Sequence, residues 1–185
     1  QLPDKVPPAI TFTSPLTNVG HNFIIAANIT DVGGVSNPAS VTLTVNGTLA
    51  AASVDVTNPH DVILSSSVTD VPNGVATLVI TATDDAGNVN SSTLSVTVDS
   101  APDLITVNPT GKTINATESL QFSAVVADQY GQTIVVPLTW TLEPAAAGSI
   151  TSAGLFTAAD TANGTVKVIA SAGGKSGNTT VTVLP

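Results

Sequence analysis

The sequence predicts an all-β protein built of antiparallel sheets, and three observations lead to this fold class. Thr and Ser number 28 and 17 of the 185 residues, and the apolar side chains are mostly Ala, Val, Ile and Leu, with one Trp, one Tyr and four Phe. The β-branched residues Thr and Val fit a pleated, half-buried surface better than a helix. Apolar and polar residues alternate along many short runs, and turn signals separate these runs.

The alternating runs identify the strands. In "VTLTVNG" (41–47), Val41, Leu43 and Val45 fall on one face, and two Thr fall on the other. Because successive side chains of a strand point to opposite faces, such a run buries one face and leaves the other wet. The same pattern recurs in "STLSVTVD" (92–99), "SLQFSAVV" (119–126), "PLTWTLE" (137–143) and "NTTVTVLP" (178–185). We therefore expect half-buried strands, with Trp140 facing a core.

Gly and Asn lie between the runs at intervals of about ten residues, the spacing of a β-sandwich. Both residues tolerate the positive φ that tight hairpin turns require. The turn signals are Asn46-Gly47, Asn73-Gly74, Asp85-Ala86-Gly87-Asn88, Tyr130-Gly131, Asn163-Gly164 and Gly173-Gly174. They predict antiparallel hairpins throughout the chain.

A domain boundary is predicted near "VDSAPDL" (98–104), where a strand ends and a polar segment with a Pro precedes the next strand. Each side has close to the roughly 100 residues of an immunoglobulin-type sandwich. We expect residues 1–7 to be a tether or donor segment, 8–99 the first sandwich, 100–102 a linker and 103–185 the second sandwich. The fold class is thus two tandem immunoglobulin-like antiparallel β-sandwiches joined by a short linker.

Both halves resemble bacterial immunoglobulin-like domains. The first half resembles such repeats through "ITFTSP", "VTLTVNG" and "TATDDAGN", over most of residues 8–99. The second half, over nearly all of 103–185, resembles the group 2 domain of intimin- and invasin-like adhesins, through "ITVNPTGKTINATESLQFSAVVADQYGQTIVVPLTWTLEP" and "GSITSAGLFTA". Thr117-Glu118 stands where such domains usually have Gly-Glu, so we expect a stiffer bend there. The resemblance implies a secreted or surface protein and supplies no catalytic residue.

Charge and composition exclude several classes of function. Asp and Glu number 13 against 4 basic residues, all of them Lys, for a formal net charge of −9. Nucleic-acid binding requires basic groups that displace counterions from phosphates, so this class is excluded. Cys is absent, which removes disulfides and thiolate sites. With no Met and no apolar run near roughly 18 residues, we expect an exported, processed chain at a prokaryotic cell surface, without membrane insertion.

The stretch "TATDDAGNVN" (81–90) places two carboxylates side by side. Neighbours on a strand point to opposite faces, so Asp84 and Asp85 are not a catalytic pair around one bond. A hairpin corner is the favoured interpretation, because Asp bonds its own backbone in turns. Calcium is the alternative, with Asp84 and Asp85 joined by Asp99, Asp103 or Asp31 near the predicted domain junction. Apart from calcium, we expect no cofactor.

Other motifs favour structural interpretations. "AGGKSG" (172–177) mimics a phosphate-binding loop, but Ile169 stands where the pattern needs Gly, and a strand follows instead of a helix. His21 and His60 lie beside turn residues and form no two-His metal spacing, and no G-x-S-x-G elbow supplies a nucleophile. Tyr130 is the better exposed aromatic, and one Tyr is a thin basis for glycan binding.

Six asparagines stand in N-x-[ST] sequons, about twice the number that chance gives for this composition. They are Asn28, Asn46, Asn90, Asn115, Asn163 and Asn178. Asn46 and Asn163 fall at predicted turn tips, where a bulky glycan fits. Glycosylation depends on a host able to carry it out.

No constellation in the sequence supports catalysis, so we expect a non-enzymatic structural module of a cell-surface protein: a layer, a stalk or a self-assembling fibre subunit. Its partners would be copies of itself or neighbouring modules of one array, and "AITFTSP" (9–15) would add to a neighbour's sheet edge. Deleting residues 1–13 would then abolish assembly and leave both sandwiches folded. The alternatives are a glycan-binding or accessory module of a secreted enzyme, and an adhesin segment that binds a protein.

Overall fold

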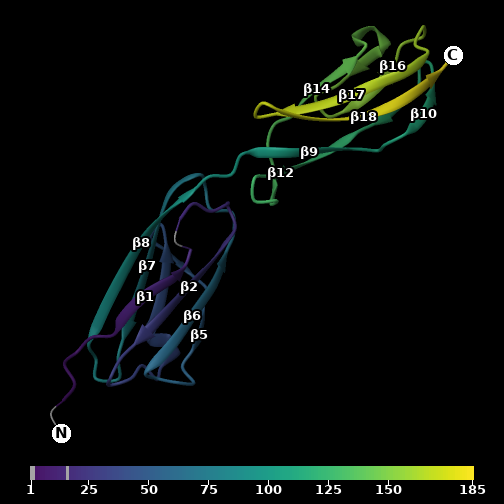
Figure 1. Cartoon of the computed structure of the whole chain (residues 1–185). Coiled ribbons are helices and arrows are strands. Elements are labelled where there is room, and N and C mark those ends of the chain that lie inside the picture. Colours follow the sequence, from purple (N-terminus) through teal and green to yellow (C-terminus); the bar gives the residue numbers. More distant parts are fainter. Residues whose placement is uncertain (1–2, 16) are drawn as a thin grey trace. The chain divides into compact units, whose positions relative to one another are not determined.

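The computed structural model describes residues 3–15 and 17–185 of the chain. The chain divides into two compact units, Gln1–Asp99 and Ser100–Pro185, which we call the first and second units (Figure 1). Both consist of β-strands and short turns. Among the described residues, no helix is long and apolar enough to cross a membrane.

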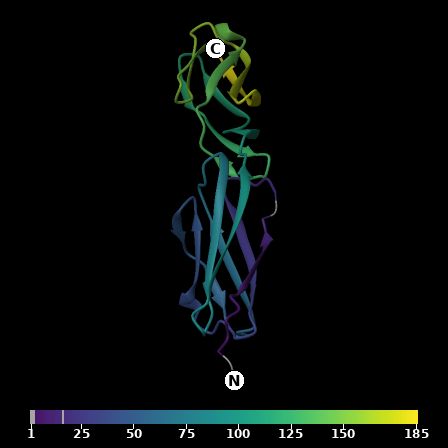
Figure 2. The ribbon, with the colours of Figure 1, turned by 90° about the vertical axis from the view of Figure 1, so that its left-hand side faces the viewer.

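The first unit contains two four-stranded antiparallel sheets whose strands run lengthwise (Figure 2). One sheet has the order β1-β2-β6-β5, with β1 (Ala9–Ser14), β2 (Phe23–Thr30), β5 (Ser53–Asp55) and β6 (Asp61–Val68). The other has the order β4-β3-β7-β8, with β3 (Val41–Val45), β4 (Thr48–Ala50), β7 (Gly74–Thr83) and β8 (Val89–Val98). A short 3-10 turn, η1 (Pro38–Ser40), precedes β3.

The predicted alternation fills the core of the first unit. Along β7 and β8, buried apolar residues alternate with more exposed residues, many of them Thr or Ser, and Leu78, Ile80 and Val98 are almost completely buried. Facing them across the core are Ile25, Ile29 and other residues of β2 and β6. The outward Thr and Ser pair across strands, as the 2.7 Å bond between Thr81 and Ser91 hydroxyls illustrates.

The second unit contains three sheets. The largest has the order β10-β18-β17-β14, with β10 (Lys112–Asn115), β14 (Thr139–Glu143), β17 (Gly164–Ala172) and β18 (Lys175–Leu184). The others are β11-β16-β15, with β11 (Ser119–Gln121), β15 (Gly148–Ile150) and β16 (Leu155–Ala158), and β13-β12-β9, with β9 (Pro102–Asn108), β12 (Ser123–Asp128) and β13 (Thr133–Ile134). The 3-10 turn η2 (Ala145–Ala147) precedes β15. All pairs of strands are antiparallel except β10 with β18.

Phe122 and Phe156 form the centre of the second core, with ring centroids 6.5 Å apart. Trp140 on β14 is half-buried and packs against this core, as its alternation predicts. Gly154 lies so close to the indole that a Cβ there would approach the ring to 3.1 Å. The packing confirms the inward orientation of Trp140.

These sheets make the chain two tandem immunoglobulin-like antiparallel β-sandwiches, which confirms the predicted fold class. Residues 99–101 carry no strand, and β9 begins two residues before the predicted start at Leu104. The predicted turns hold positive φ, at Asn46 and Gly47 in the β3–β4 hairpin and at Gly173 and Gly174 between β17 and β18. Because β18 follows this last turn directly, "AGGKSG" is a hairpin and not a phosphate-binding loop.

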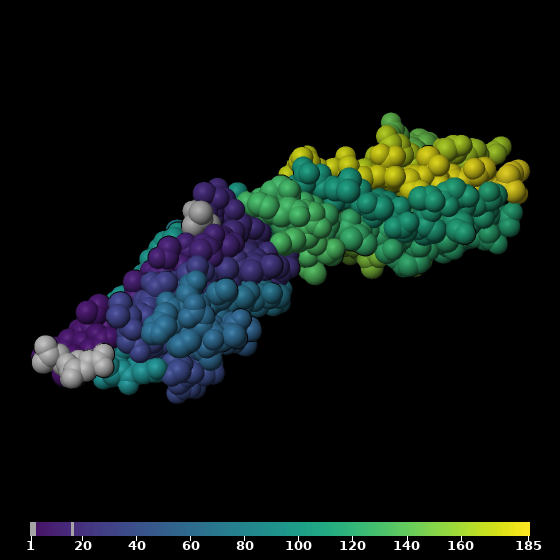
Figure 3. Space-filling model, turned by 60° about the horizontal axis from the view of Figure 1, so that its bottom comes forward, coloured from purple at the N-terminus to yellow at the C-terminus, as the bar shows by residue number. Residues whose placement is uncertain are grey.

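The expectation that the segment with "AITFTSP" is loose is wrong, while its addition to a neighbour's sheet edge stays a prediction. Residues 9–14 form β1, which pairs with β2 of its own sheet and lies on the surface of the first unit (Figure 3, dark purple). Ile10 and Phe12 of β1 pack against the core. The apolar side chains that would suit a neighbouring sheet therefore already pack within their own unit. Deleting residues 1–13 would therefore remove most of the edge strand β1, together with the core contacts of Ile10 and Phe12.

Candidate cation site

Three carboxylates from distant parts of the sequence converge at one end of the first unit. Asp31 directly follows β2, and Asp84 directly follows β7. Asp4 precedes β1, whose first residue pairs with the last residue of β2. The strand ends of both sheets thus meet the N-terminal segment here, and each of the three Asp offers one oxygen within 4.8 Å of the others.

Asp84 opens a tight turn that joins β7 to β8. Its N–H donates to Asn88 O at 3.0 Å, and its Oδ1 accepts from the N–H groups of Ala86 and Asn88 at 2.9 and 2.8 Å. Burial is the largest single influence on the pKa of Asp84 and raises it, but the hydrogen bonds from Asn88, Ala86 and Gly87 together hold the pKa below its usual value. Gly87 supplies the positive φ, 91°, that the corner requires.

Asp85 is not one of the three clustered carboxylates and instead bonds the loop between β2 and β3, which also carries Asp31. Its carboxylate accepts from the Ser36 hydroxyl at 2.5 Å and from the Ser36 N–H at 3.0 Å. These two hydrogen bonds lower the pKa of Asp85, and the charge of His60 acts in the same direction. The predicted corner is therefore present and is closed by Asp84, which also faces the cluster, while the calcium site stays a prediction.

Asp31 is almost completely buried, at 8% exposed. Its Oδ2 accepts from the N–H of Gly34 at 2.7 Å, while its Oδ1 is buried without a hydrogen-bond partner. His60, which the sequence assigns to a loop, contacts the backbone here: its Nδ1 lies 2.9 Å from Asp31 O. The second carboxylate oxygen of Asp31 is thus enclosed with no donor to stabilise its charge.

Asp4 reaches the cluster from the N-terminal segment. Its Oδ1 accepts from the Val6 N–H at 2.9 Å, and its Oδ2 is buried without a hydrogen-bond partner. A Cβ on Gly33 would collide with this Oδ2, so the carboxylate of Asp4 occupies space that only glycine leaves open. The side chain of Asn88 joins the two segments, donating to Asp84 Oδ2 at 2.7 Å and to Asp4 O at 3.3 Å.

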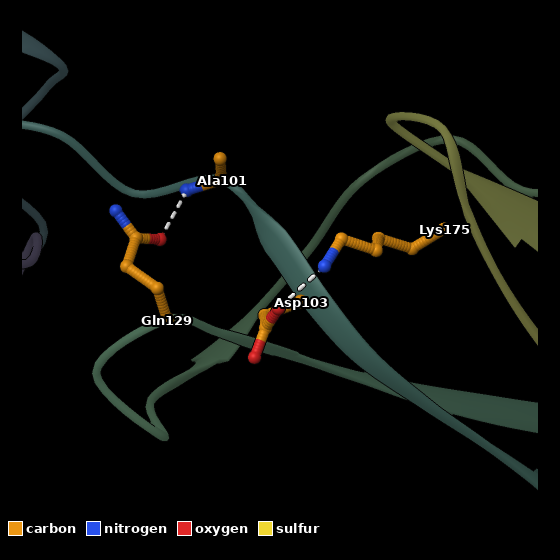
Figure 4. A network of polar contacts seen from close by, with 4 residues as sticks. All are labelled: Ala101, Asp103, Gln129 and Lys175. Carbon is orange, nitrogen blue, oxygen red and sulfur yellow. Dashed lines mark hydrogen bonds and ion pairs between the residues drawn. The ribbon is translucent and has the colours of Figure 1, made fainter.

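The other two predicted calcium ligands lie elsewhere. Asp99 follows β8, while Asp84 precedes it, and ten residues of strand span roughly 33 Å, so one ion cannot reach both. Asp103 belongs to the second unit, where its Oδ1 accepts from Lys175 Nζ at 2.6 Å (Figure 4). In the same view, Gln129 Oε1 accepts from the N–H of Ala101. The charge of Asp103 is therefore used to fasten β9 to β18.

Sequence reasoning missed Asp4 and undervalued Asp31. Asp4 lies in a segment that the composition marks as a tether, and nothing local shows that it folds back on the unit. Asp31 carries a readable signal, because "TDVGG" (30–34) places two glycines two and three residues after the carboxylate at a strand end. A cluster of this kind depends on which strand ends meet, and one sequence does not display that pairing.

All six sequon asparagines are exposed. Asn46 takes a positive φ of 51° at its predicted turn tip. Asn90 differs from the rest, because its side-chain nitrogen, the atom that would carry a glycan, donates to Pro8 O at 2.7 Å. Glycosylation at Asn90 would break this hold on the N-terminal segment, so the geometry favours the other five. Glycosylation itself stays a prediction.

Neither a family model nor a curated protein sequence matches this chain. Solved structures resemble it in fold. They include domains 4 and 5 of the S-layer protein SbsC (19% identity, TM-score 0.43, covering 64% of this chain and 69% of that one) and fibronectin(III)-like modules of Clostridium thermocellum CbhA (19%, 0.37, 95% and 94%). Titin domains z1z2, solved with telethonin, are similar at 15% identity (0.42, 97% and 98%). These distant likenesses concern the fold alone, and the resemblance to the intimin and invasin group stays a prediction.

Proposed function

We propose that this chain is a non-enzymatic structural module of an exported cell-surface protein, and that its two sandwiches act as load-bearing spacers. One observation carries the proposal: the chain enters and leaves each unit at opposite ends. The end of the first unit that holds Asp4 also holds the start of β8, and β8 runs from there to the exit at Val98. Ten residues of strand separate entry from exit by roughly 33 Å.

The second unit repeats this arrangement. Asp103, at the entry, is bonded to Lys175, the first residue of β18, and a Cβ on Gly173 would press against Pro102. β18 then runs ten residues to Leu184 at the exit. A pull applied at the two ends of either unit acts along its terminal strands. Because sheet hydrogen bonds lie across the strands, such a pull loads many of them together instead of one after another.

Four short edge strands and the covered ends of β8 favour a spacer over a polymer built by strand addition. Short edge strands protect sheets from pairing with other chains, and β4, β5, β11 and β15 have three residues each. The ten-residue edge strand β8 is covered at both ends. Asn90 donates to Pro8 at its start, and Val19 exchanges backbone hydrogen bonds with Thr97 and Asp99 at its end.

Force spectroscopy on the whole chain, held at its two ends, tests the proposal. We expect two separate unfolding events, each releasing roughly 250–300 Å of extended chain. Gradual extension at low force, without two events, would contradict a load-bearing role. The rival function, an accessory module that binds glycan, predicts saturable retention of the chain on an insoluble polysaccharide, and finding it would replace the spacer proposal.

A further inference from the structure

We propose that Asp4, Asp31 and Asp84 bind one calcium ion, which fastens the N-terminal segment (residues 3–8) to the first unit. The ion would be held by three carboxylates that come from before β1, after β2 and after β7. It would thus join the N-terminal segment to the ends of both sheets.

The first argument is the state of the carboxylate oxygens. Asp31 is 8% exposed and Asp84 is 5% exposed, and Asp31 Oδ1 and Asp4 Oδ2 are buried with no hydrogen-bond partner. A buried anionic oxygen without a donor is costly, and three carboxylates this close repel one another. Among the described residues, the ion pairs of lysine side chains lie in the second unit, at Glu143–Lys167 and Asp103–Lys175. A divalent cation would satisfy the oxygens and offset the repulsion together.

The second argument is fit. Calcium takes oxygen ligands at about 2.3–2.6 Å, so two ligands on opposite sides of one ion lie up to about 5 Å apart. The three Asp oxygens lie within 4.8 Å of one another and so meet this limit. Calcium accepts six to eight oxygen ligands in flexible geometry. Three carboxylates, each binding through one or both of its oxygens, can provide this number together with water. The exclusively oxygen donor set does not suit a thiolate- or imidazole-preferring metal.

The third argument is that the surrounding residues hold the carboxylates in place. Gly33 leaves the space that the Asp4 carboxylate fills, and this glycine has no positive φ that would otherwise require it. Gly34 N–H fixes one oxygen of Asp31, and the N–H groups and side chain of the Asp84 turn fix both oxygens of Asp84. Two of the three ligands are therefore oriented before any ion arrives, and the third, Asp4, comes from the segment before β1.

Calorimetric titration of the full chain with calcium, after removal of metal with a chelator, tests the site. We expect one calcium ion per chain, and Asp4→Asn should weaken binding by at least roughly tenfold because one charged ligand is lost. Asp31→Asn should do the same. Asp70→Asn is the matched control: Asp70 is exposed, lies in the same unit beyond the far end of β6, and its positive φ of 57° suits Asn equally well.

Cleavage by a lysine-specific protease tests the fastening itself. Lys5 lies inside the N-terminal segment, and exposed Lys112 in the second unit reports the activity of the protease under each condition. Calcium should slow cleavage after Lys5 by roughly tenfold relative to Lys112, and Asp4→Asn should remove this protection. The Asp4 variant keeps the test valid if Asp31→Asn fails to fold.

Three results would overturn the proposal: no saturable calcium binding by the wild-type chain, unchanged binding in Asp4→Asn, or protection of Lys5 that is equal with calcium and with chelator. Magnesium is measured in parallel. Equal affinity for magnesium would overturn the assignment of calcium.

Discussion

The turns that begin at Asp84 and Asp128 have the same hydrogen bonds in different surroundings. Each Asp donates its N–H to the carbonyl of the residue four positions on, and each Oδ1 accepts from the second and fourth N–H groups that follow. Gly87 and Gly131 hold positive φ at the same place in both turns. The local sequence therefore builds one device, an Asp-x-x-Gly-x corner, once in each sandwich.

The difference between the two turns lies in what approaches them from elsewhere in the chain. Asp84 meets Asp4 and Asp31, whereas Asp128 is joined by no comparable pair of carboxylates within the described part of the chain. The hydrogen bonds of both turns hold the Asp at the corner in place. We infer that Asp84 is a ligand as well, because two further carboxylates reach it. The comparison teaches that a corner becomes a candidate site through long-range convergence and not through its own motif.

Replacing each Asp with Ala separates the two roles and should have the largest effect. Asp128→Ala leaves two N–H groups of its turn without their acceptor, which we expect to cost about 2 kcal/mol and to lower the Tm of the second unit by roughly 10 °C. In chelator, Asp84→Ala should lower the Tm of the first unit by less than Asp128→Ala lowers that of the second unit. Removing the Asp84 carboxylate also removes its repulsion from the carboxylates of Asp4 and Asp31. Scanning calorimetry resolves the two transitions, and a larger loss at Asp84 in chelator would contradict the repulsion.

Acid should affect the first unit next most strongly. The hydrogen bonds around Asp84 and Asp85 hold both pKa values below the ordinary range, so their stabilisation is fully present above the unfolded-state pKa of about 4 and is lost as pH falls through the lower folded-state values. Acid should lower the Tm of the first unit by less than Asp84→Ala lowers it when calcium is present, because a protonated carboxyl group still accepts hydrogen bonds. Tm measured from pH 7 to pH 3 checks this. Asp84→Asn/Asp85→Asn should flatten the curve, and an unchanged slope would refute the assignment.

Alanine at the two glycines should give equal losses, which tests the identity of the turns. An added Cβ at Gly87 or Gly131 meets nothing within 4 Å, so only the positive φ opposes the substitution. Each change should cost about 1 kcal/mol, or roughly 5 °C in the Tm of its own unit. Unequal losses of Tm would mean that residues around the first turn also affect the stability of its backbone conformation.

The reverse substitution should give the smallest effect. Thr117 takes a positive φ of 69°, where the resembling domains have Gly, and a β-branched residue is strained there. We expect Thr117→Gly to stabilise the second unit by about 0.5 kcal/mol, the relief of strain being partly offset by the entropy of glycine. Thr117→Ala is the control, because it removes the hydroxyl and keeps the strain. A gain in the alanine variant alone would contradict this account.

Much of the fold could be predicted from the sequence, because strand periodicity and turn chemistry are local. Val41, Leu43, Val96 and Val98 are buried as their alternation predicts. The site could be predicted only in part. Asp84 stands at a predicted hairpin corner, but its proximity to Asp31 depends on how two sheets stack. Asp99 and Asp103 lie close to the domain boundary in sequence, but ten residues of β8 carry the chain away from Asp84 before it reaches them.

Amide NMR spectra of the full chain during a calcium titration test the central claim most directly. The account predicts saturable shifts in the amides of residues 3–8, 31–34 and 84–88, with the amides of 128–132 unchanged. The second turn thus serves as a control within the same molecule. Equal shifts at both turns, or none at either, would contradict the claim that convergence with Asp4 and Asp31 makes the first corner a cation site.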